Sequence, residues 1–323
     1  MQRAPEATII IATRNRAALL RDALASIRAD QSSVPREVIV VDNGSTDATP
    51  AVLAEASRVQ ARMPLRCLTE RRPGKAQALN AAVLASRGDC LLFTDDDVLV
   101  GNGWADGLCG ALSAGTVGAA GGRVQPIWST PPPSWLTADL AASLGIRDLG
   151  DDRRAVGPLD IIGANMGLRR AALQELGEPF SSSLGPRGRV KTDFEEAHLL
   201  QLVSARWQLV YEPTARVKHR IQPERLSPKW IRRMFYQRGF GRSLHDQMMG
   251  IHEPQRPDLS DRARALLFLR RAWGYRRRHA RTGGWDAARA ALEVDAFFWA
   301  GYHLDMALQA FPLPWRRGLA RLV

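Results

Sequence analysis

Short apolar runs alternate with stretches of helical periodicity along the first hundred residues. The runs are rich in β-branched residues and end in polar ones, as strands buried on both faces of a sheet do. We expect strands over 7–13, 37–42, 65–68 and 91–94. Apolar residues at helical spacing predict helices over 16–27, from the turn at 43–47 to about 62, and over 75–86. Strands that alternate with helices form parallel sheets, so the pattern indicates an α/β fold.

Carboxylates stand at the ends of two of these strands. Asp42 closes the second run, and Asp95, Asp96 and Asp97 follow the fourth. The carboxyl ends of parallel strands share one edge of a sheet, where ligand crevices form. Adjacent, partly buried carboxylates repel one another, and a hard divalent cation would relieve this repulsion. Polar turns in which aspartate caps the next helix are the alternative interpretation.

The composition is that of a soluble globular protein, with 45% hydrophobic and 24% charged residues. A length of 323 residues allows one large domain or two ordinary ones. Cys67, Cys90 and Cys109 are too few for a disulfide framework or a zinc site, and we expect Cys67 and Cys90 in the core. Since neither a signal peptide nor a charge-free window of about 18 residues is present, we expect a cytoplasmic protein.

Positive charge is concentrated in the last third of the chain. The net charge is +12, and residues 216–289 hold 19 Lys or Arg against 6 Asp or Glu, a net of +13. From residue 227 onward the pattern is helical, and aromatic residues stand beside arginines, which suits a helix in a membrane interface. An anionic partner is therefore expected: lipid headgroups, nucleic acid or an acidic glycan intermediate. Alternatively, the apolar faces pack on the rest of the protein and the arginines are solvated.

Two common nucleotide-binding motifs are missing from the sequence. There is no GxxxxGK[ST] loop, and the glycines at 115, 118, 121 and 122 do not follow the GxGxxG spacing. The sequence therefore disfavours a P-loop ATPase and a dinucleotide-dependent enzyme.

The order and spacing of several motifs resemble family 2 of the glycosyltransferases, which has the GT-A fold. The first three are VVDNGSTD at 40–47, RRPGKAQALNAA at 71–82 and LLFTDDDV at 91–98. Further matches lie at 121–124, 132–136, 162–170, 192–195, 211–213 and 217–219. The resemblance implies a Rossmann-like, mostly parallel sheet flanked by helices, in a transferase domain over 1–225. Its donor half would cover about 1–125 and its acceptor half about 126–225, followed by a basic, amphipathic helical region at 226–323.

The resemblance also implies roles for the acidic residues. Asp42 matches the position that recognises the base or ribose, while Asp95 and Asp97 match the DxD motif, with Asp97 on the metal. His219 follows a short strand expected over 215–218 and matches a third metal ligand or a diphosphate contact. Imidazole as a ligand would favour Mn²⁺ over Mg²⁺. Asp96 either joins this site or is structural, and Arg71 and Lys75 could be ordinary surface cations. The expected nucleotide-sugar contacts are Thr13, Asn15, Asp42, Arg71, Lys75, Asp95 and Asp96.

The candidate general base is Asp193. Glycosyl transfer needs a carboxylate within hydrogen-bond reach of the acceptor hydroxyl. The family usually has a Glu-Asp pair at this position, and Thr192 replaces the glutamate here; Glu195 and Glu196 are alternative bases. Asp193 could instead cap a helix over 194–204. The acceptor-side residues implied by the resemblance are Asn165, Glu195 and Trp135.

Together these features predict a metal-dependent, inverting glycosyltransferase. Its donor would be a nucleotide-diphosphate sugar, with a UDP-sugar favoured, and its acceptor a hydroxyl of a glycan or polyprenyl-linked molecule in cell-surface polysaccharide synthesis. A peripheral position on an anionic membrane surface, at the inner face of the cell membrane, is a further expectation. One alternative is a sugar-1-phosphate nucleotidyltransferase, although residues 11–16 lack its GxGxRL loop. The other is a polyanion-binding protein, although no specific nucleic acid is expected.

Overall fold

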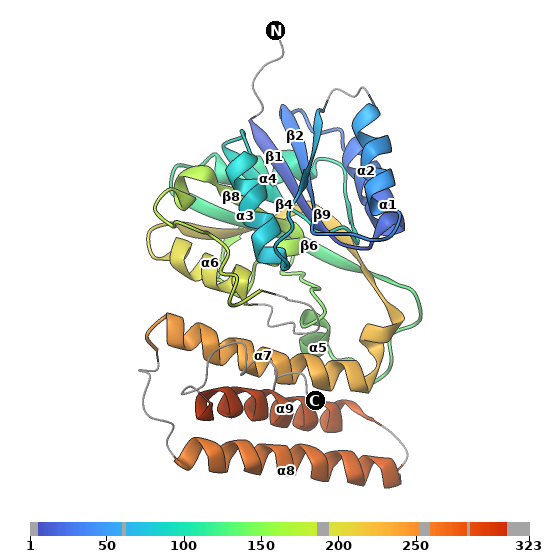
Figure 1. Cartoon of the computed structure of the whole chain (residues 1–323), viewed down its shortest axis with the longest axis vertical. Helices are drawn as coiled ribbons and strands as arrows, with labels where there is room; N and C mark the ends of the chain where they lie inside the picture. Colours follow the sequence, from blue (N-terminus) through green and yellow to red (C-terminus); the bar gives the residue numbers. More distant parts are fainter. Residues whose placement is uncertain (1–5, 60–62, 186–193, 252–258, 283–284, 309–323) are drawn as a thin grey trace. The chain divides into compact units, whose positions relative to one another are not determined.

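The structure, a computed structural model, describes residues 6–59, 63–185, 194–251, 259–282 and 285–308 (Figure 1). The chain divides into two compact units. The first contains 1–127, 145–182 and 196–220, and the second contains 128–144, 183–195 and 221–323. Within the described ranges, no helix combines the length and the apolar character that crossing a lipid bilayer requires. The division into domains at 1–225 and 226–323 stays a prediction.

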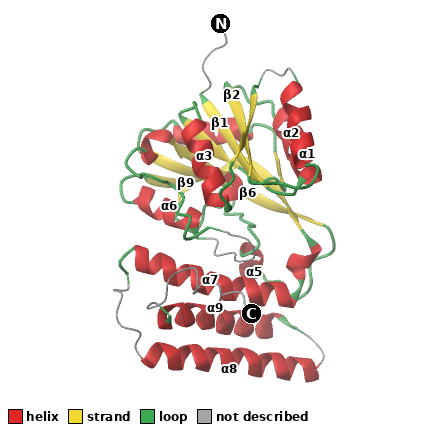
Figure 2. Ribbon diagram, viewed as in Figure 1, coloured by secondary structure: helices red, strands yellow, loops and turns green. Residues whose placement is uncertain are grey.

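The first unit is built on a mixed sheet of nine strands among the described residues, in the order β3-β2-β1-β4-β8-β6-β9-β5, with β7 paired to β9. Strands β3, β2, β1 and β4 run parallel, as the alternating pattern predicts, and β8 reverses direction beside β4. The expected α/β class is therefore confirmed (Figure 2). The strands are β1 (Ala7–Thr13), β2 (Arg36–Asp42), β3 (Leu65–Thr69), β4 (Cys90–Phe93), β5 (Val98–Val100), β6 (Val117–Trp128), β7 (Arg154–Ala155), β8 (Met166–Arg169) and β9 (Gln208–Ile221).

Helices bury the sheet on both faces. Ile9 and Ile11 of β1 belong to the apolar cluster that includes α1 and α2, whereas Ile10 belongs to the cluster that includes α3 and α6. Successive strand residues point to opposite faces, so the continuous apolar run is buried on both. The helices are α1 (Ala17–Ala29), α2 (Thr49–Arg58), α3 (Lys75–Ala85), α4 (Trp104–Leu112) and α6 (Glu195–Ser204), with 3₁₀ turns at Gly163–Asn165 and Arg170–Leu173.

Two sequence predictions are corrected at the sheet. Cys67 is exposed rather than in the core, because its strand β3 lies at the edge of the sheet and one of its faces is open. The strand predicted around residues 215–218 is the middle of β9, which has 14 residues. Buried and exposed positions alternate along much of β9, as in a strand with one covered face. The exposed positions carry polar or charged residues, so the strand contains no long apolar run and only a short part of it was predicted.

The second unit is mainly helical, as the pattern from residue 227 onward predicts. It contains α5 (Ala138–Ala142), a 3₁₀ turn at Pro223–Leu226, α7 (Pro228–Met248), α8 (Leu259–Thr282) and α9 (Ala287–Ala307). Helix α9 packs against both α7 and α8, so these three helices form a layered bundle (Figure 1). Glycines allow a close approach between α7 and α9, because a Cβ on Gly239 would lie 1.8 Å from the carbonyl oxygen of Phe298.

Candidate active site

The acidic residues lie at the carboxyl edge of the parallel strands. Thr13 at the end of β1 is in register with Asp42 at the end of β2, and β4 runs parallel to β1 on its other side. The Thr13 hydroxyl donates a hydrogen bond of 2.7 Å to Oδ2 of Asp96. Thr13 thus connects the strand ends that carry Asp42 and the run from Asp95 to Asp97. We call Asp42, Asp95, Asp96 and Asp97 the acidic edge.

Burial makes the acidic edge costly to ionise. Asp42, Asp96 and Asp97 are each at least nine-tenths buried. Burial, with a smaller contribution from the charges of Asp97 and Asp95, raises the pKa of Asp96 to about 6, although Arg16 and the Thr13 hydroxyl act in the opposite direction. This edge therefore favours the approach of positive charge.

Arg16 supplies part of that charge, and the sequence analysis missed it. Its Nη1 lies 3.0 Å from Oδ2 of Asp97 and 3.8 Å from Oδ1 of Asp96. Burial alone would lower the pKa of Arg16, but the two carboxylates raise it overall. In the sequence, Arg16 is recognisable only as a basic residue just past the end of the first strand. Its carboxylate partners lie some eighty positions later, so local sequence does not indicate the pairing.

His219 comes to the same carboxylates through the antiparallel pairing of β5 with β9. His219 is in register with Val98, the residue after Asp97. Its Nε2 lies 3.4 Å from Oδ1 of Asp97, and both side chains are buried. The two predicted metal ligands are thus neighbours. In the described part of the chain, no group of three or more His, Cys, Asp or Glu side chains is arranged to hold a metal ion.

Lys75 pairs with the exposed end of the acidic edge. It is the first residue of α3, and its Nζ lies 2.9 Å from Oδ1 of Asp95 and 3.0 Å from Oε1 of Glu196. The other oxygen of Glu196 accepts a hydrogen bond from the amide of Gly163. A Cβ at Gly163 would lie 2.0 Å from this carboxylate, so a larger residue at this position would displace the Glu196 side chain.

Asn43 fixes the loop that leads to Lys75, a role that the sequence analysis did not assign. Its Nδ2 donates hydrogen bonds to the carbonyls of Glu70 and Arg72, and its Oδ1 accepts one from the amide of Gly74. Gly74 has φ +131°, which L-residues with side chains rarely adopt. The predicted contact Arg71 lies exposed in this loop.

Asp42 and Asn15 also shape the turn that follows β2. Oδ1 of Asp42 accepts the amide of Ser45 at 2.9 Å, and Oδ1 of Asn15 accepts the amide of Thr46 at 2.7 Å. Asn15 adopts φ +54°, a left-handed conformation that asparagine tolerates. Asp42 therefore stabilises a turn, but it does not cap the next helix, because the N-cap residue of α2 is Ala48.

The predicted acceptor-side residues belong to different units. Asn165 lies in the interior, where its amide donates to the carbonyls of Arg123 and Ala215 and accepts from Trp104. The side-chain amide of Asn165 is therefore bonded within the protein, and its acceptor-side role stays a prediction. Glu195 and Trp135 belong to the second unit, and both are buried there. Asp193 lies outside the described residues.

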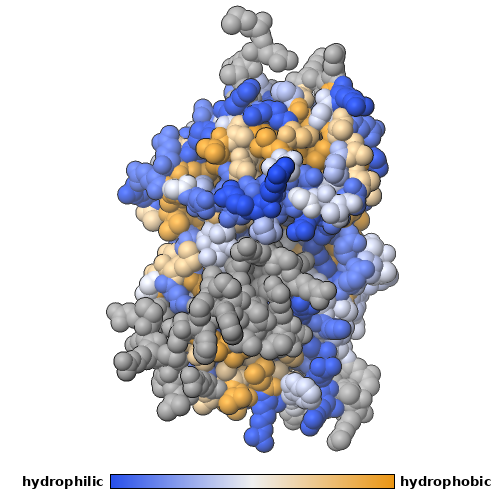
Figure 3. All heavy atoms as spheres, in the orientation of Figure 1, coloured by the Kyte–Doolittle hydropathy of each residue, from blue (hydrophilic) through white to orange (hydrophobic). Residues whose placement is uncertain are grey.

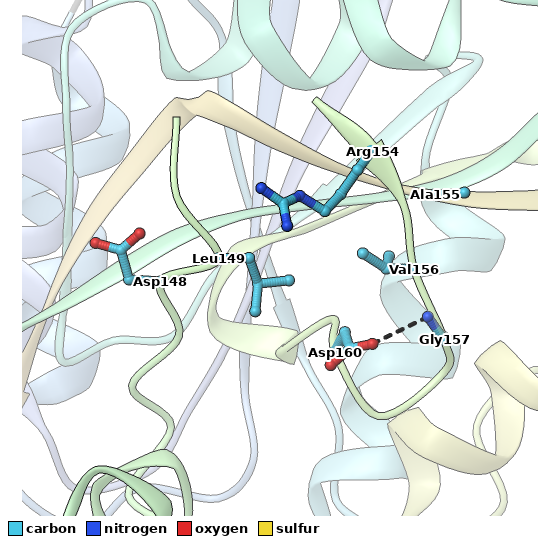
Figure 4. A pocket seen from close by; sticks show the side chains of 7 residues that line it. All are labelled: Asp148, Leu149, Arg154, Ala155, Val156, Gly157 and Asp160. Carbon is cyan, nitrogen blue, oxygen red and sulfur yellow. Dashed lines mark hydrogen bonds between the residues drawn. The ribbon is translucent and has the colours of Figure 1, made fainter. Parts of the chain in front are cut away.

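A further hollow of about 740 Å³ lies beside β7 in the first unit (Figure 4). The amide of Gly157 donates to Oδ2 of Asp160 at 3.0 Å on its wall. Its lining residues are Asp148, Leu149, Arg154, Ala155, Val156, Gly157 and Asp160. No member of the acidic edge lines it, so it is a separate feature.

Comparisons with known proteins agree on one family and one fold. Residues 8–177 match the profile of Glycosyl transferase family 2. The succinoglycan biosynthesis protein ExoM of Rhizobium meliloti (strain 1021) is 30% identical over 223 residues, 67% of either chain. A glucosyl-3-phosphoglycerate synthase of Mycolicibacterium paratuberculosis (strain ATCC BAA-968 / K-10) is 42% identical over 64 residues, which is only 20% of either chain.

Solved structures extend the similarity of fold. A mannosyltransferase from Pyrobaculum calidifontis, in complex with GDP-Man and Mn²⁺, superposes with a TM-score of 0.56 at 20% identity, over 98% of this chain and 73% of that one. GalNAc-T7 with UDP, GalNAc and Mn²⁺ gives 0.52 at 16% identity, over 72% and 48%. At these identities the likeness establishes the architecture, which is that of the GT-A transferases.

Proposed function

Because this chain belongs to glycosyltransferase family 2, we propose that it moves a sugar from a nucleotide-diphosphate sugar, with a UDP-sugar favoured, to a hydroxyl of a glycan or polyprenyl-linked acceptor. The pathway is cell-surface polysaccharide synthesis, supported by the similarity to a succinoglycan biosynthesis protein. The enzyme works in the cytoplasm, at the inner face of the membrane.

The observation that carries this proposal is the acidic edge with its basic neighbours. Three of its four carboxylates, those of Asp95 to Asp97, lie beside Arg16, Lys75 or His219, which come from three other parts of the chain. Carboxylates at Asp42 and Asp95 are acceptors suited to the ribose hydroxyls and the N–H of a base. Lys75 and the amides that open α3 suit the negative charge of a diphosphate.

A divalent cation, Mn²⁺ or Mg²⁺, fits the donors at this edge. Asp97 and His219 would hold it, and their neighbouring donor atoms form a two-ligand site on the protein. Such ions commonly take one or two protein carboxylates and complete their coordination with substrate phosphates and water. When bound, the cation would neutralise charge on the departing nucleoside diphosphate. Arg16 donates a hydrogen bond to the other oxygen of Asp97 and would orient that carboxylate.

A single general base accounts for the expected inversion at the anomeric carbon, and we assign this role to Asp193. The base removes the proton of the acceptor hydroxyl while that oxygen attacks the sugar. Glu196 is a weaker candidate, because one of its oxygens is bound to Lys75 and the other to the amide of Gly163. Glu195 is weaker as well because it is buried.

Calorimetric titration of UDP and GDP, with and without Mn²⁺, tests the donor site. We expect metal-dependent binding of one nucleotide to the wild type and at least a tenfold loss with Asp97→Ala, which removes a cation ligand. Asp89→Ala is the matched control, because Asp89 is an exposed carboxylate just before β4, at the opposite end of that strand from Asp97. Binding that is absent, or that needs no metal, would refute the role assigned to the acidic edge.

A further inference from the structure

Helix α8 has two faces of different character. One face packs against α9 in an apolar cluster. The residues of α8 in this cluster are Phe268, Leu269, Ala272 and Tyr275. The remaining surface exposes three large apolar side chains: Leu266 at 68%, Leu267 at 48% and Trp273 at 54% exposed. These side chains are available for a partner.

The exposed apolar residues alternate with arginines in a regular way. Leu266, Arg270, Trp273 and Arg277 follow one another at spacings of four, three and four residues, which brings them into one stripe along a helix. The guanidinium of Arg277 lies 5.2 Å from the centre of the Trp273 ring, and that of Arg276 lies 5.9 Å from it. We call Leu266, Leu267, Arg270, Trp273 and Arg277 the α8 outer face.

Helix α8 is the most basic helix of the second unit; α7 carries five Lys or Arg against one acidic residue. Helix α8 contains eight arginines and one acidic residue, Asp261, which lies 3.0 Å from His303 of α9. Helix α9 contains one arginine and three acidic residues. Blue and orange residues lie side by side at the lower end of Figure 3, where Figure 1 places α8. The positive charge is therefore concentrated on the helix with exposed leucines and tryptophan, and its complement is an anionic, partly apolar surface.

We propose that the α8 outer face docks on an anionic phospholipid bilayer, with the helix parallel to the membrane surface. This inference rests on the membrane location given under the proposed function. Trp273 and the two leucines would enter the interface between headgroups and acyl chains, while the arginines contact lipid phosphates. A nucleic acid would satisfy the arginines and leave the leucines in water. A second copy would bring two arginine-rich faces together, which is repulsive.

Co-sedimentation of the full chain with vesicles tests this inference. We expect binding to phosphatidylcholine vesicles that contain phosphatidylglycerol, little binding without it, and weakening as salt rises. Leu266→Ser with Trp273→Ser should lower the partition coefficient about tenfold or more, since two apolar side chains are lost. Arg270→Glu with Arg277→Glu should lower it by at least about fivefold per position. The controls are Leu84→Ser and Arg58→Glu, exposed residues on α3 and α2.

Metal-dependent nucleotide binding, measured on the same samples, separates this inference from the proposed function. The variants should keep it, which also shows that they are folded. A chain that binds nucleotide but no anionic vesicles overturns the docking surface alone. Equal binding to vesicles without phosphatidylglycerol would also overturn it. So would a dimer in solution that Trp273→Ser dissociates, because the α8 outer face would then be an interface between two copies. Preference for polyuridylate, unaffected by the serine changes, would assign the face to nucleic acid.

Discussion

At the scale of single residues, each of three consecutive carboxylates has its own partner. Asp95 pairs with Lys75, Asp96 accepts a hydrogen bond from Thr13, and Asp97 lies beside Arg16 and His219. These partners come from three other segments of the chain, because Thr13 and Arg16 both lie at or just past the end of β1. Their arrangement lets the acidic edge fold without a metal ion, and the proposed cation would add to it.

Replacing Arg16 should make the protein more dependent on metal. Arg16→Met leaves Asp97 and Asp96 with less compensating charge, and we expect a loss of about 1–2 kcal/mol in the free energy of unfolding in EDTA. Added Mn²⁺ should then stabilise the variant more than the wild type. Thermal and urea unfolding with and without Mn²⁺ measure both effects. Arg14→Met, at an exposed position, is the control, and an equal response of all three proteins to Mn²⁺ would contradict the prediction.

Asp96 should make the stability of the metal-free protein depend on pH. Its pKa is about 6 in the folded protein and near 3.8 in the unfolded chain, so the folded state holds the proton over a range where the unfolded chain has lost it. The contribution of Asp96 is therefore favourable below pH 4, and it falls by up to about 3 kcal/mol as the pH rises through 6. Asp96→Asn removes this pH-dependent contribution to stability.

Urea unfolding between pH 4 and 7 in EDTA measures the contribution of Asp96 to stability. The stability of the Asp96→Asn variant relative to the wild type should increase steadily over this interval. Asp89→Asn, at an exposed carboxylate, should show a nearly constant difference. A constant difference for Asp96→Asn as well would contradict the raised pKa.

At the scale of elements, glycines let the backbones of neighbouring helices and strands come into direct contact. A Cβ on Gly239 of α7 would lie 1.8 Å from the carbonyl oxygen of Phe298, and one on Gly301 of α9 would lie 2.0 Å from that of Tyr236. The two helices thus contact each other backbone to backbone at two reciprocal points. Strand β9 approaches the backbone of β6 just as closely at Gly122, where a Cβ would lie 2.0 Å from the carbonyl oxygen of Ala215.

A methyl group at the contact between α7 and α9 should be costly. We expect Gly301→Ala to lower the free energy of unfolding by about 1–3 kcal/mol, because a backbone atom rather than a flexible side chain must move. Gly110→Ala in α4 is the matched control: nothing lies within 4 Å of its Cβ, so better helix propensity should raise stability by up to about 1 kcal/mol. Urea unfolding compares them, and equal effects of the two changes would refute the close contact.

At the scale of the whole molecule, the second unit is assembled from segments far apart in sequence. Trp135 packs edge-on against Trp285, with ring centres 4.7 Å apart. The Arg232 guanidinium lies 5.0 Å from the centre of the Trp285 ring and forms an ion pair of 2.9 Å with the fully buried Glu293. Phe194 packs against the apolar cluster on α7, so the segment just after the candidate base Asp193 is held by the helical unit.

Breaking the buried ion pair should destabilise the protein strongly. Arg232→Met leaves the Glu293 carboxylate buried without this partner, and we expect a loss of about 3–5 kcal/mol. The double change of Arg232→Met with Glu293→Met removes both charges and should recover most of that loss. Urea unfolding of the single and double variants forms the test. If the double variant is as unstable as the single one, packing rather than charge explains the loss.

The strand ends are the part of the site that can be predicted from the sequence. Asp42 and Asp95 to Asp97 directly follow apolar runs, and the alternation with helices places such ends at one edge of a parallel sheet. The partners of these residues could not be predicted in the same way. Arg16 and His219 reach Asp97 through the strand topology, which brings together positions about eighty and more than a hundred residues apart.

Local periodicity was sufficient for the first four strands, the three helices between them and the acidic edge, because these depend on residues that are neighbours in the chain. The family could also be identified from the order of the motifs. Only the tertiary structure decided that Cys67 is exposed on an edge strand, that Asn165 is bonded in the interior, and that Trp135 and Phe194 pack among the C-terminal helices. The physical reason is that burial and pairing depend on which segments are adjacent in space, and composition along the chain does not encode that adjacency directly.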